Sequence, residues 1–106
     1  MEAQIEKSIC DALTKLGHFV IKLKDQSAYR DGAYRKGTSY QIRGVADLVV
    51  FLKKGVTVWL EVKTSLGRQS EAQIAFQKKI ESLGHIYKLV RSAKEAVDII
   101  SKLNNN

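Results

Sequence analysis

The chain has 106 residues, 44% of them hydrophobic, so it is long enough to bury the core of one compact domain and too short for two. Its 18 Lys and Arg outnumber 11 Asp and Glu, which gives a net charge of +7. Such a charge is typical of a protein with a polyanionic partner, most simply nucleic acid, although a basic protein kept soluble by its charge would have the same balance. No apolar run approaches the ~20 residues of a membrane-spanning helix.

Cysteine usage and the N-terminal residues exclude further classes. Cys10 is the sole cysteine, so an internal disulfide is excluded, and with His18 and His85 it is too sparse for a structural zinc site. Residues 1–16 alternate charged and apolar side chains and have no continuous hydrophobic stretch. We therefore expect no secretory signal and an intracellular, cytoplasmic protein.

The first half of the chain predicts one helix and one strand, followed by a long irregular segment. Apolar residues at helical spacing, among them Ile5 and Ile9, predict a helix over residues 2–16 that Gly17 ends. Alternating apolar residues predict a strand over 18–23. Residues 25–43 show no clear periodicity, and a stretch of that length in a compact domain is typically functional or mobile.

The second half predicts a hairpin and then a helix, a strand and a helix. Two apolar, β-prone runs flank the turn at 53–55, and both later helices open on a capping box. The predicted elements are strands over 46–52 and 56–63, a link over 64–69, a helix over 70–83, a strand over 85–90 and a helix from 92 to 103. We expect a single α/β domain over 1–103, with a mixed sheet flanked by helices, and a disordered tail over 104–106.

Two carboxylates stand inside the two most apolar strands. If Lys54 is the centre of the turn, Asp47 and Glu61 are equally far from it and become cross-strand neighbours, with Cβ atoms roughly 4.5–5.5 Å apart. Because two such carboxylates repel each other, either one takes a proton or a cation lies between them. Hard oxygen ligands suit Mg²⁺, and Lys63 projects from the same strand face as Glu61. The alternative is an ordinary exposed ion pair of Glu61 and Lys63.

The ordered set Gly44-Val45-Ala46-Asp47, Glu61-Val62-Lys63 and Gln73 resembles the core of the PD-(D/E)XK nucleases, and most closely the virus-type replication-repair (VRR-NUC) family. The resemblance covers most of the chain and implies a restriction-endonuclease-like α-β-β-β-α-β core with a C-terminal helix. One departure is Ala46, where the family usually has proline. This substitution changes the stiffness of the strand entrance and removes no ligand.

The resemblance implies a role for several residues and a Mg²⁺ cofactor, for which Mn²⁺ would substitute. Asp47 and Glu61 would be metal ligands together with the carbonyl of Val62, and Lys63 would be the catalytic lysine. Gln73 matches a glutamine of these nucleases and is also a capping-box residue, and both roles are compatible. An acid from the first helix is expected to reach the metal, with Glu6 as the first choice and Glu2 as the second.

The resemblance further implies a homodimer, of viral or prophage type, that cuts branched DNA such as four-way junctions, since a symmetric junction needs two related cuts. Flaps, linear ends or single-stranded nucleic acid are alternative substrates. A DNA-binding module without catalysis and a small interaction protein are alternative functions.

The expected DNA contacts come from basic residues and tyrosines, most of them in the irregular segment 25–43. The basic residues would follow the phosphate backbone of the DNA. The tyrosines would stack on bases, or they instead pack this segment onto the protein core. These residues are Lys22, Arg30, Arg35, Lys36, Arg43, Tyr29, Tyr34 and Tyr40.

Overall fold

The structure is a computed structural model that describes residues 1–23 and 43–105. The order of its elements is helix, three strands, helix, strand and helix, as the sequence predicts. The elements are α1 (Glu2–Lys15), β1 (Phe19–Lys22), β2 (Leu48–Phe51), the 3₁₀ turn η2 (Lys53–Gly55), β3 (Thr57–Val62), α2 (Glu71–Ser82), β4 (Ile86–Val90) and α3 (Ala93–Asn104). No helix in these described ranges is both long and apolar enough to cross a bilayer.

One mixed sheet, with strand order β1-β2-β3-β4, forms the middle layer. The first three strands are antiparallel neighbours, and β4 returns parallel to β3 after the crossover through α2. Strands β2 and β3 form the predicted hairpin, in which Val49 faces Trp59 and Val50 faces Val58. The register is centred on Lys54, whose φ of 63° gives the tight reversal together with Gly55.

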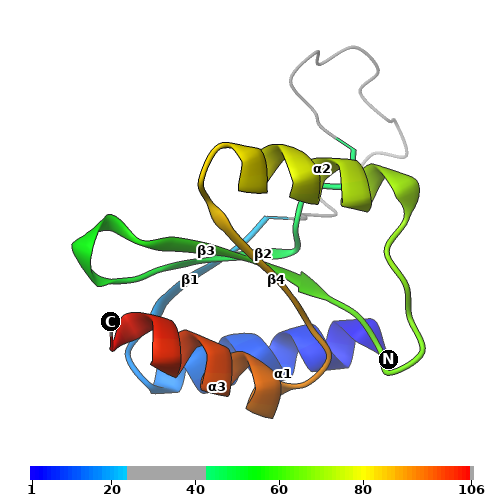
Figure 1. Cartoon of the computed structure of the whole chain (residues 1–106). Coiled ribbons are helices and arrows are strands. Elements are labelled where there is room, and N and C mark those ends of the chain that lie inside the picture. Colours follow the sequence, from blue (N-terminus) through cyan, green and yellow to red (C-terminus); the bar gives the residue numbers. More distant parts are fainter. Residues whose placement is uncertain (24–42, 106) are drawn as a thin grey trace, which may run out of the picture.

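Helices cover both faces of the sheet (Figure 1), with α1 and α3 on one side and α2 on the other. Strand alternation divides the side chains of β3 between these faces. Val58, Leu60 and Val62 belong to the larger core cluster, which also contains Ile9 and Leu13 of α1. On the opposite face Ala46, Phe76 and Tyr87 form a smaller cluster beneath α2.

The element boundaries differ from the sequence prediction by one or two residues, and two of these differences affect the site and the tail. The predicted strand over 46–52 shortens to Leu48–Phe51, yet the amide of Asp47 still donates to the carbonyl of Leu60 at 3.1 Å, which extends the pairing to the motif aspartate. The tail predicted over 104–106 begins too early, because α3 includes Asn104 and its cap, Asn105, donates back to the carbonyl of Ser101 at 3.2 Å. The last one or two residues of a helix are poorly specified by the sequence, so a prediction of this boundary is easily off by that amount.

Candidate active site

Asp47 is fixed at the entrance of β2 by the backbone of the neighbouring strands. Its carbonyl accepts from the amide of Leu23 at 2.8 Å, and its Oδ2 accepts from the amide of Val62 at 2.7 Å. The side chain is only 3% exposed. A carboxylate held this tightly by β3 has a defined direction, toward the face of the sheet that α2 covers.

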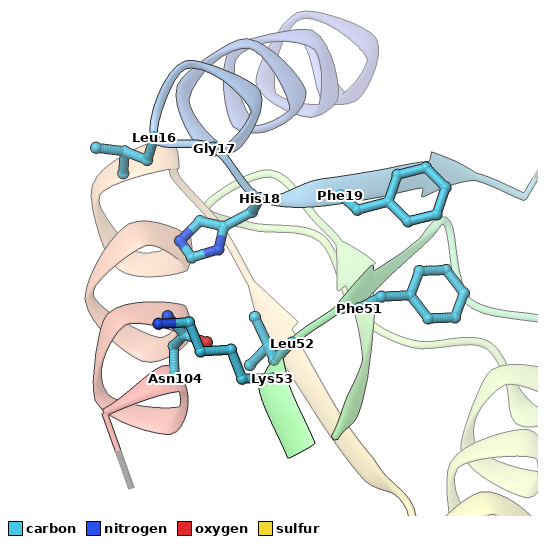
Figure 2. Close-up of a pocket in the computed structure, with 8 residues that line it drawn as sticks. All are labelled: Leu16, Gly17, His18, Phe19, Phe51, Leu52, Lys53 and Asn104. Atoms are coloured by element: carbon cyan, nitrogen blue, oxygen red, sulfur yellow. The ribbon is translucent and has the colours of Figure 1, made fainter. Parts of the chain in front are cut away.

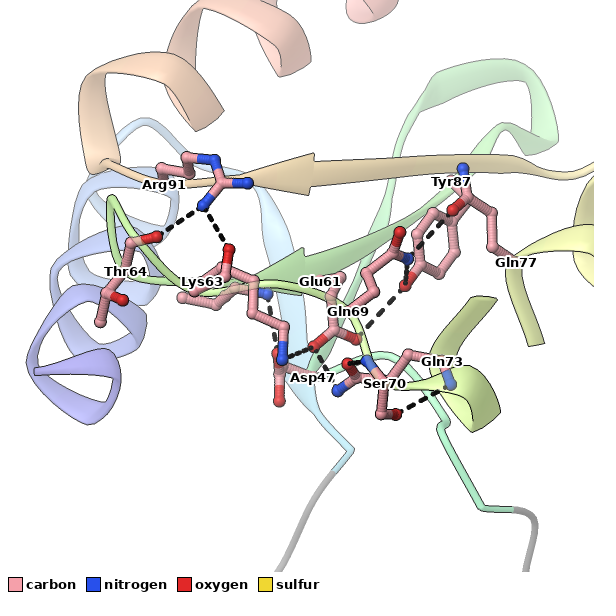
Figure 3. A network of polar contacts seen from close by, with 12 residues as sticks. Asp47, Glu61, Lys63, Thr64, Gln69, Ser70, Gln73, Gln77, Tyr87 and Arg91 are labelled. Atoms are coloured by element: carbon pink, nitrogen blue, oxygen red, sulfur yellow. Dashed lines mark hydrogen bonds and ion pairs between the residues drawn. The ribbon is translucent and has the colours of Figure 1, made fainter. Parts of the chain in front are cut away.

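Glu61 lies at the centre of a polar group in which every member is less than one-tenth exposed: Asp47 (3%), Glu61 (0%), Lys63 (8%) and Gln73 (8%). Its Oε2 accepts from Nε2 of Gln73 at 2.9 Å and lies 3.6 Å from Nζ of Lys63. Its Oε1 accepts from the hydroxyl of Tyr87 at 3.3 Å. Figure 3 shows Asp47, Glu61 and Lys63 converging beside the first turn of α2. The alternative of an exposed ion pair therefore does not describe Glu61 and Lys63.

The start of α2 brings Gln73 to this group. Ser70 caps the helix: its hydroxyl accepts from the amide of Gln73 at 3.2 Å, and Oε1 of Gln73 accepts from the amide of Ser70 at 2.8 Å. The predicted capping box is therefore confirmed. Because Oε1 is engaged by the cap, Nε2 of Gln73 points at Glu61, and one side chain joins the helix start to the carboxylate.

Gly44 allows α2 to approach the strand that carries Asp47. Its φ is +79°, and a Cβ built there would lie 2.3 Å from the carbonyl carbon and oxygen of Ala72 and 2.6 Å from the amide nitrogen of Gln73. A side chain has no room at this position, so glycine is required on both counts. Gly44 therefore lets the first turn of α2, which carries Gln73, lie directly against the segment that leads to Asp47.

Three further polar residues support the site and were not predicted from the sequence. Arg91, at the end of β4, donates through Nη1 to the carbonyls of Thr64 at 2.6 Å and Gly67 at 2.8 Å, and so holds the link that follows Lys63. Tyr87 contacts Glu61 directly, and Gln69 is linked to Glu61 through the hydroxyl of Tyr87. Only the alternation of strand β4 could have drawn attention to Tyr87, because the parallel register that places it beside β3 is not encoded locally.

The acids of the first helix do not join this group. Glu6 is partly buried and pairs with Lys22 of β1, with Oε1 3.2 Å from Nζ, and Glu2 is exposed. Burial and the negative charge of Glu6 raise the pKa of the neighbouring Cys10 thiol. Across residues 1–23 and 43–105 no cluster of three or more His, Cys, Asp or Glu side chains could hold a metal. Glu6 as a helix-one catalytic acid therefore stays a prediction.

The predicted DNA contacts are mostly outside the described residues. Arg43 is exposed and directly precedes Gly44, and the exposed Lys22 side chain lies on β1. The other basic residues and the tyrosines of this prediction fall within 24–42, which the structure does not describe: Arg30, Arg35, Lys36, Tyr29, Tyr34 and Tyr40.

A separate pocket lies at the opposite end of β1 and β2 (Figure 2). Its volume is about 310 Å³, and the exposed rings of Phe19 and Phe51 stand at its edge, with their centroids 5.3 Å apart. The described lining contains no carboxylate: Leu16, Gly17, His18, Phe19, Phe51, Leu52, Lys53 and Asn104. Without a carboxylate, and with Lys53 in its lining, this pocket is a poor site for a hard cation, so the described acidic residues that could bind one are Asp47 and Glu61.

The donor set at Asp47 and Glu61 fits a magnesium ion. Mg²⁺ is usually bound through one or two protein carboxylates and completes its octahedron with water and substrate phosphate oxygens. Two buried carboxylates on adjacent strands, with backbone carbonyls such as that of Val62 close by in sequence, provide such a partial set. Lys63 adds a positive charge beside them and offsets part of their mutual repulsion.

Most of the chain matches the fold of a domain of known structure. A solved structure described as a VRR_NUC domain aligns with it at a TM-score of 0.68, with 24% sequence identity and 94% of each chain covered. No protein-family model and no curated protein matches the sequence. The predicted resemblance is therefore confirmed at the level of the fold: the protein is a single α/β domain with the restriction-endonuclease-like fold of a VRR-NUC domain.

Proposed function

We propose that the protein is a Mg²⁺-dependent endodeoxyribonuclease that hydrolyses phosphodiester bonds in branched DNA, in the manner of a Holliday-junction resolvase. The observation that carries this proposal is the buried Asp47–Glu61 pair with Lys63 beside it, on a nuclease-type fold. Buried carboxylates are costly to a small domain, so their presence at one place favours a ligand over a structural role.

Each side chain of the site has a distinct task in this proposal. Asp47 and Glu61 would hold the ion, and Gln73 keeps Oε2 of Glu61 in place through the 2.9 Å hydrogen bond. The ion, when bound, would supply charge neutralisation at the scissile phosphate and a more acidic water. The ammonium of Lys63 is the remaining cation of the group and would orient the attacking water and stabilise charge that develops on the phosphate.

DNA as the partner is supported by the net charge of +7 and by the fold. A homodimer is part of the proposal, because two active sites related by a two-fold axis match the two cuts of a symmetric junction. The solution mass, measured with and without junction DNA, tests this directly. A monomer under both conditions would contradict junction resolution while leaving the nuclease proposal intact.

The main experiment compares a labelled immobile four-way junction, a flap and a linear duplex, each with Mg²⁺, with Mn²⁺ and with EDTA. Paired nicks in the junction that need metal would support the proposal. Lys63→Ala should reduce cleavage by roughly 10²–10³-fold, as expected when one preorganised charge at the reacting phosphate is lost. Lys102→Ala is the matched control, since it removes the same charge from the exposed end of α3.

The other outcomes distinguish the alternative functions. Metal-dependent cleavage of the flap or the linear duplex alone would keep the chemistry and change the substrate. Tight binding without cleavage, with an affinity that falls steeply as salt rises, would identify a DNA-binding module. Weak binding that salt does not affect would identify a small interaction protein.

A further inference from the structure

A chain of hydrogen bonds leads from the middle of α2 to Glu61 (Figure 3). Nε2 of Gln69 donates to Oε1 of Gln77 at 3.0 Å and to the hydroxyl oxygen of Tyr87 at 3.2 Å. The Tyr87 hydroxyl in turn donates to Oε1 of Glu61 at 3.3 Å. The chain therefore connects the helix α2 and the link before it, through Tyr87 of β4, to one carboxylate oxygen.

The direction of this chain follows from counting hydrogens. An amide nitrogen carries two hydrogens, and both of those on Gln69 are used, one toward Gln77 and one toward Tyr87. The hydroxyl of Tyr87 has a single hydrogen, and its oxygen already accepts from Gln69. That hydrogen is therefore directed at Glu61, and Tyr87 acts as a fixed donor.

Burial keeps Tyr87 in this role. The residue is 3% exposed and lies on β4 opposite Trp59 of β3, two positions along from Glu61. Phe76 of α2 packs against its ring, with centroids 6.2 Å apart. A phenol ionises only at about pH 10, so the Tyr87 hydroxyl is a hydrogen-bond donor at neutral pH.

The two oxygens of Glu61 consequently have different partners. Oε2 is engaged by Gln73 and lies near Lys63, and Oε1 is engaged by Tyr87. Hydrogen bonds at both oxygens restrict the rotation of the Glu61 carboxylate about its terminal bond. Tyr87 therefore helps to set the direction in which this carboxylate would meet a cation.

We propose that Tyr87, held in place by Gln69, is a positioning residue that orients Glu61 for divalent-cation binding. This inference rests on the metal-dependent activity proposed above and adds to it a residue from β4, outside the aspartate, glutamate and lysine of the motif. Partners that orient a metal-binding carboxylate typically contribute 10–100-fold to metal affinity.

The test is Tyr87→Phe, which removes only the hydroxyl. Mn²⁺ affinity, measured from the electron paramagnetic resonance signal of the free ion, should fall by roughly 10–100-fold. In the cleavage assay the metal concentration for half-maximal rate should rise, and saturating metal should restore most of the maximal rate. Gln69→Leu provides a second variant that keeps the tyrosine, and it should lower the affinity by a smaller factor.

Ser92→Ala is the control, because it also removes one hydroxyl but does so at the start of α3, on the other face of the sheet. It should lower thermal stability and leave Mn²⁺ affinity within about twofold of wild type. An equal loss of affinity in Ser92→Ala, or wild-type affinity in Tyr87→Phe, would overturn the role of Tyr87 while the wild-type protein still binds Mn²⁺ and cleaves DNA. A wild-type protein that neither binds Mn²⁺ nor cleaves would refute the proposed function itself, and the role of Tyr87 with it.

Discussion

Replacing Gly44 with alanine should separate the first turn of α2 from the strand that carries Asp47. The new Cβ would lie 2.3 Å from the carbonyl group of Ala72 and 2.6 Å from the amide nitrogen of Gln73. These are backbone atoms of a helix, so no side chain can move aside. To bring the new Cβ and the carbonyl group of Ala72 to an ordinary contact of 3.4 Å, the first turn of α2 has to move away by about 1 Å.

The expected cost has two parts. A left-handed backbone conformation is unfavourable for a residue with a Cβ by roughly 1–2 kcal/mol. Forcing an added methyl group into a close-packed contact typically costs a further 1–3 kcal/mol. Gly44→Ala should therefore lower the free energy of unfolding by about 2–5 kcal/mol, a large share of the stability of a domain of this size.

Gly17→Ala isolates the contact, because Gly17 also has a positive φ, +90°, yet a Cβ there meets nothing within 4 Å. Urea denaturation of both variants, followed by circular dichroism, should show Gly44→Ala less stable than Gly17→Ala by about 1–3 kcal/mol. Resonances of the Gln73 side-chain amide should shift in the first variant alone. Equal stabilities and an unmoved Gln73 would refute the close approach of helix and strand.

Three further predictions concern the cap, the first helix and the carboxylate pair. Ser70→Ala and Ser92→Ala each remove an N-cap and should each lower the free energy of unfolding by about 1 kcal/mol. Only Ser70→Ala should also weaken Mn²⁺ binding in a titration, because Ser70 bonds to Gln73, which contacts Glu61. Glu6→Gln should lower the raised pKa of Cys10 and so speed its alkylation by iodoacetamide at pH 8, and an unchanged or slower rate would contradict the contact. Asp47→Asn should raise the melting temperature without metal, since it removes one of two neighbouring buried carboxylates, and should abolish the further rise that Mg²⁺ gives the wild-type protein.

The hairpin and its register could be predicted from the sequence because the information is local. The turn at Lys54 and Gly55 and the apolar runs on either side determine which residues face each other, and the structure pairs Leu48 with Leu60 as this requires. Asp47 directly precedes Leu48 and Glu61 directly follows Leu60, and the Asp47 amide donates to the carbonyl of Leu60. Two carboxylates far apart in sequence could therefore be placed together without any knowledge of the helices.

Lys63 and Gln73 beside that pair were predicted, but the supporting residues Tyr87, Gln69 and Arg91 could not be, because their places depend on how distant elements pack. Tyr87 reaches Glu61 only because β4 is parallel to β3, in a register set by the crossover through α2. Gln69 belongs to the link between β3 and α2, and Arg91 holds this link through its carbonyls. The sequence of the link has no periodicity from which its path could be predicted. The capping box predicted where α2 starts, and the family resemblance assigned Gln73 to the site. Its hydrogen bond to Glu61 depends on how α2 packs against the sheet.

One face of the sheet provides most of the apolar core, and the other holds the buried polar residues of the site. Val58, Leu60 and Val62 point toward α1 and α3 and belong to the larger apolar cluster, which provides most of the burial. Glu61 and Lys63 alternate with them and point toward α2, where the apolar cluster is small and the polar contacts are many. The apolar face keeps β3 in place, so the α2 face can hold buried charges that a domain of this size could not otherwise tolerate. Stability and metal binding should therefore respond to separate sets of substitutions, although both sets lie on the same strand.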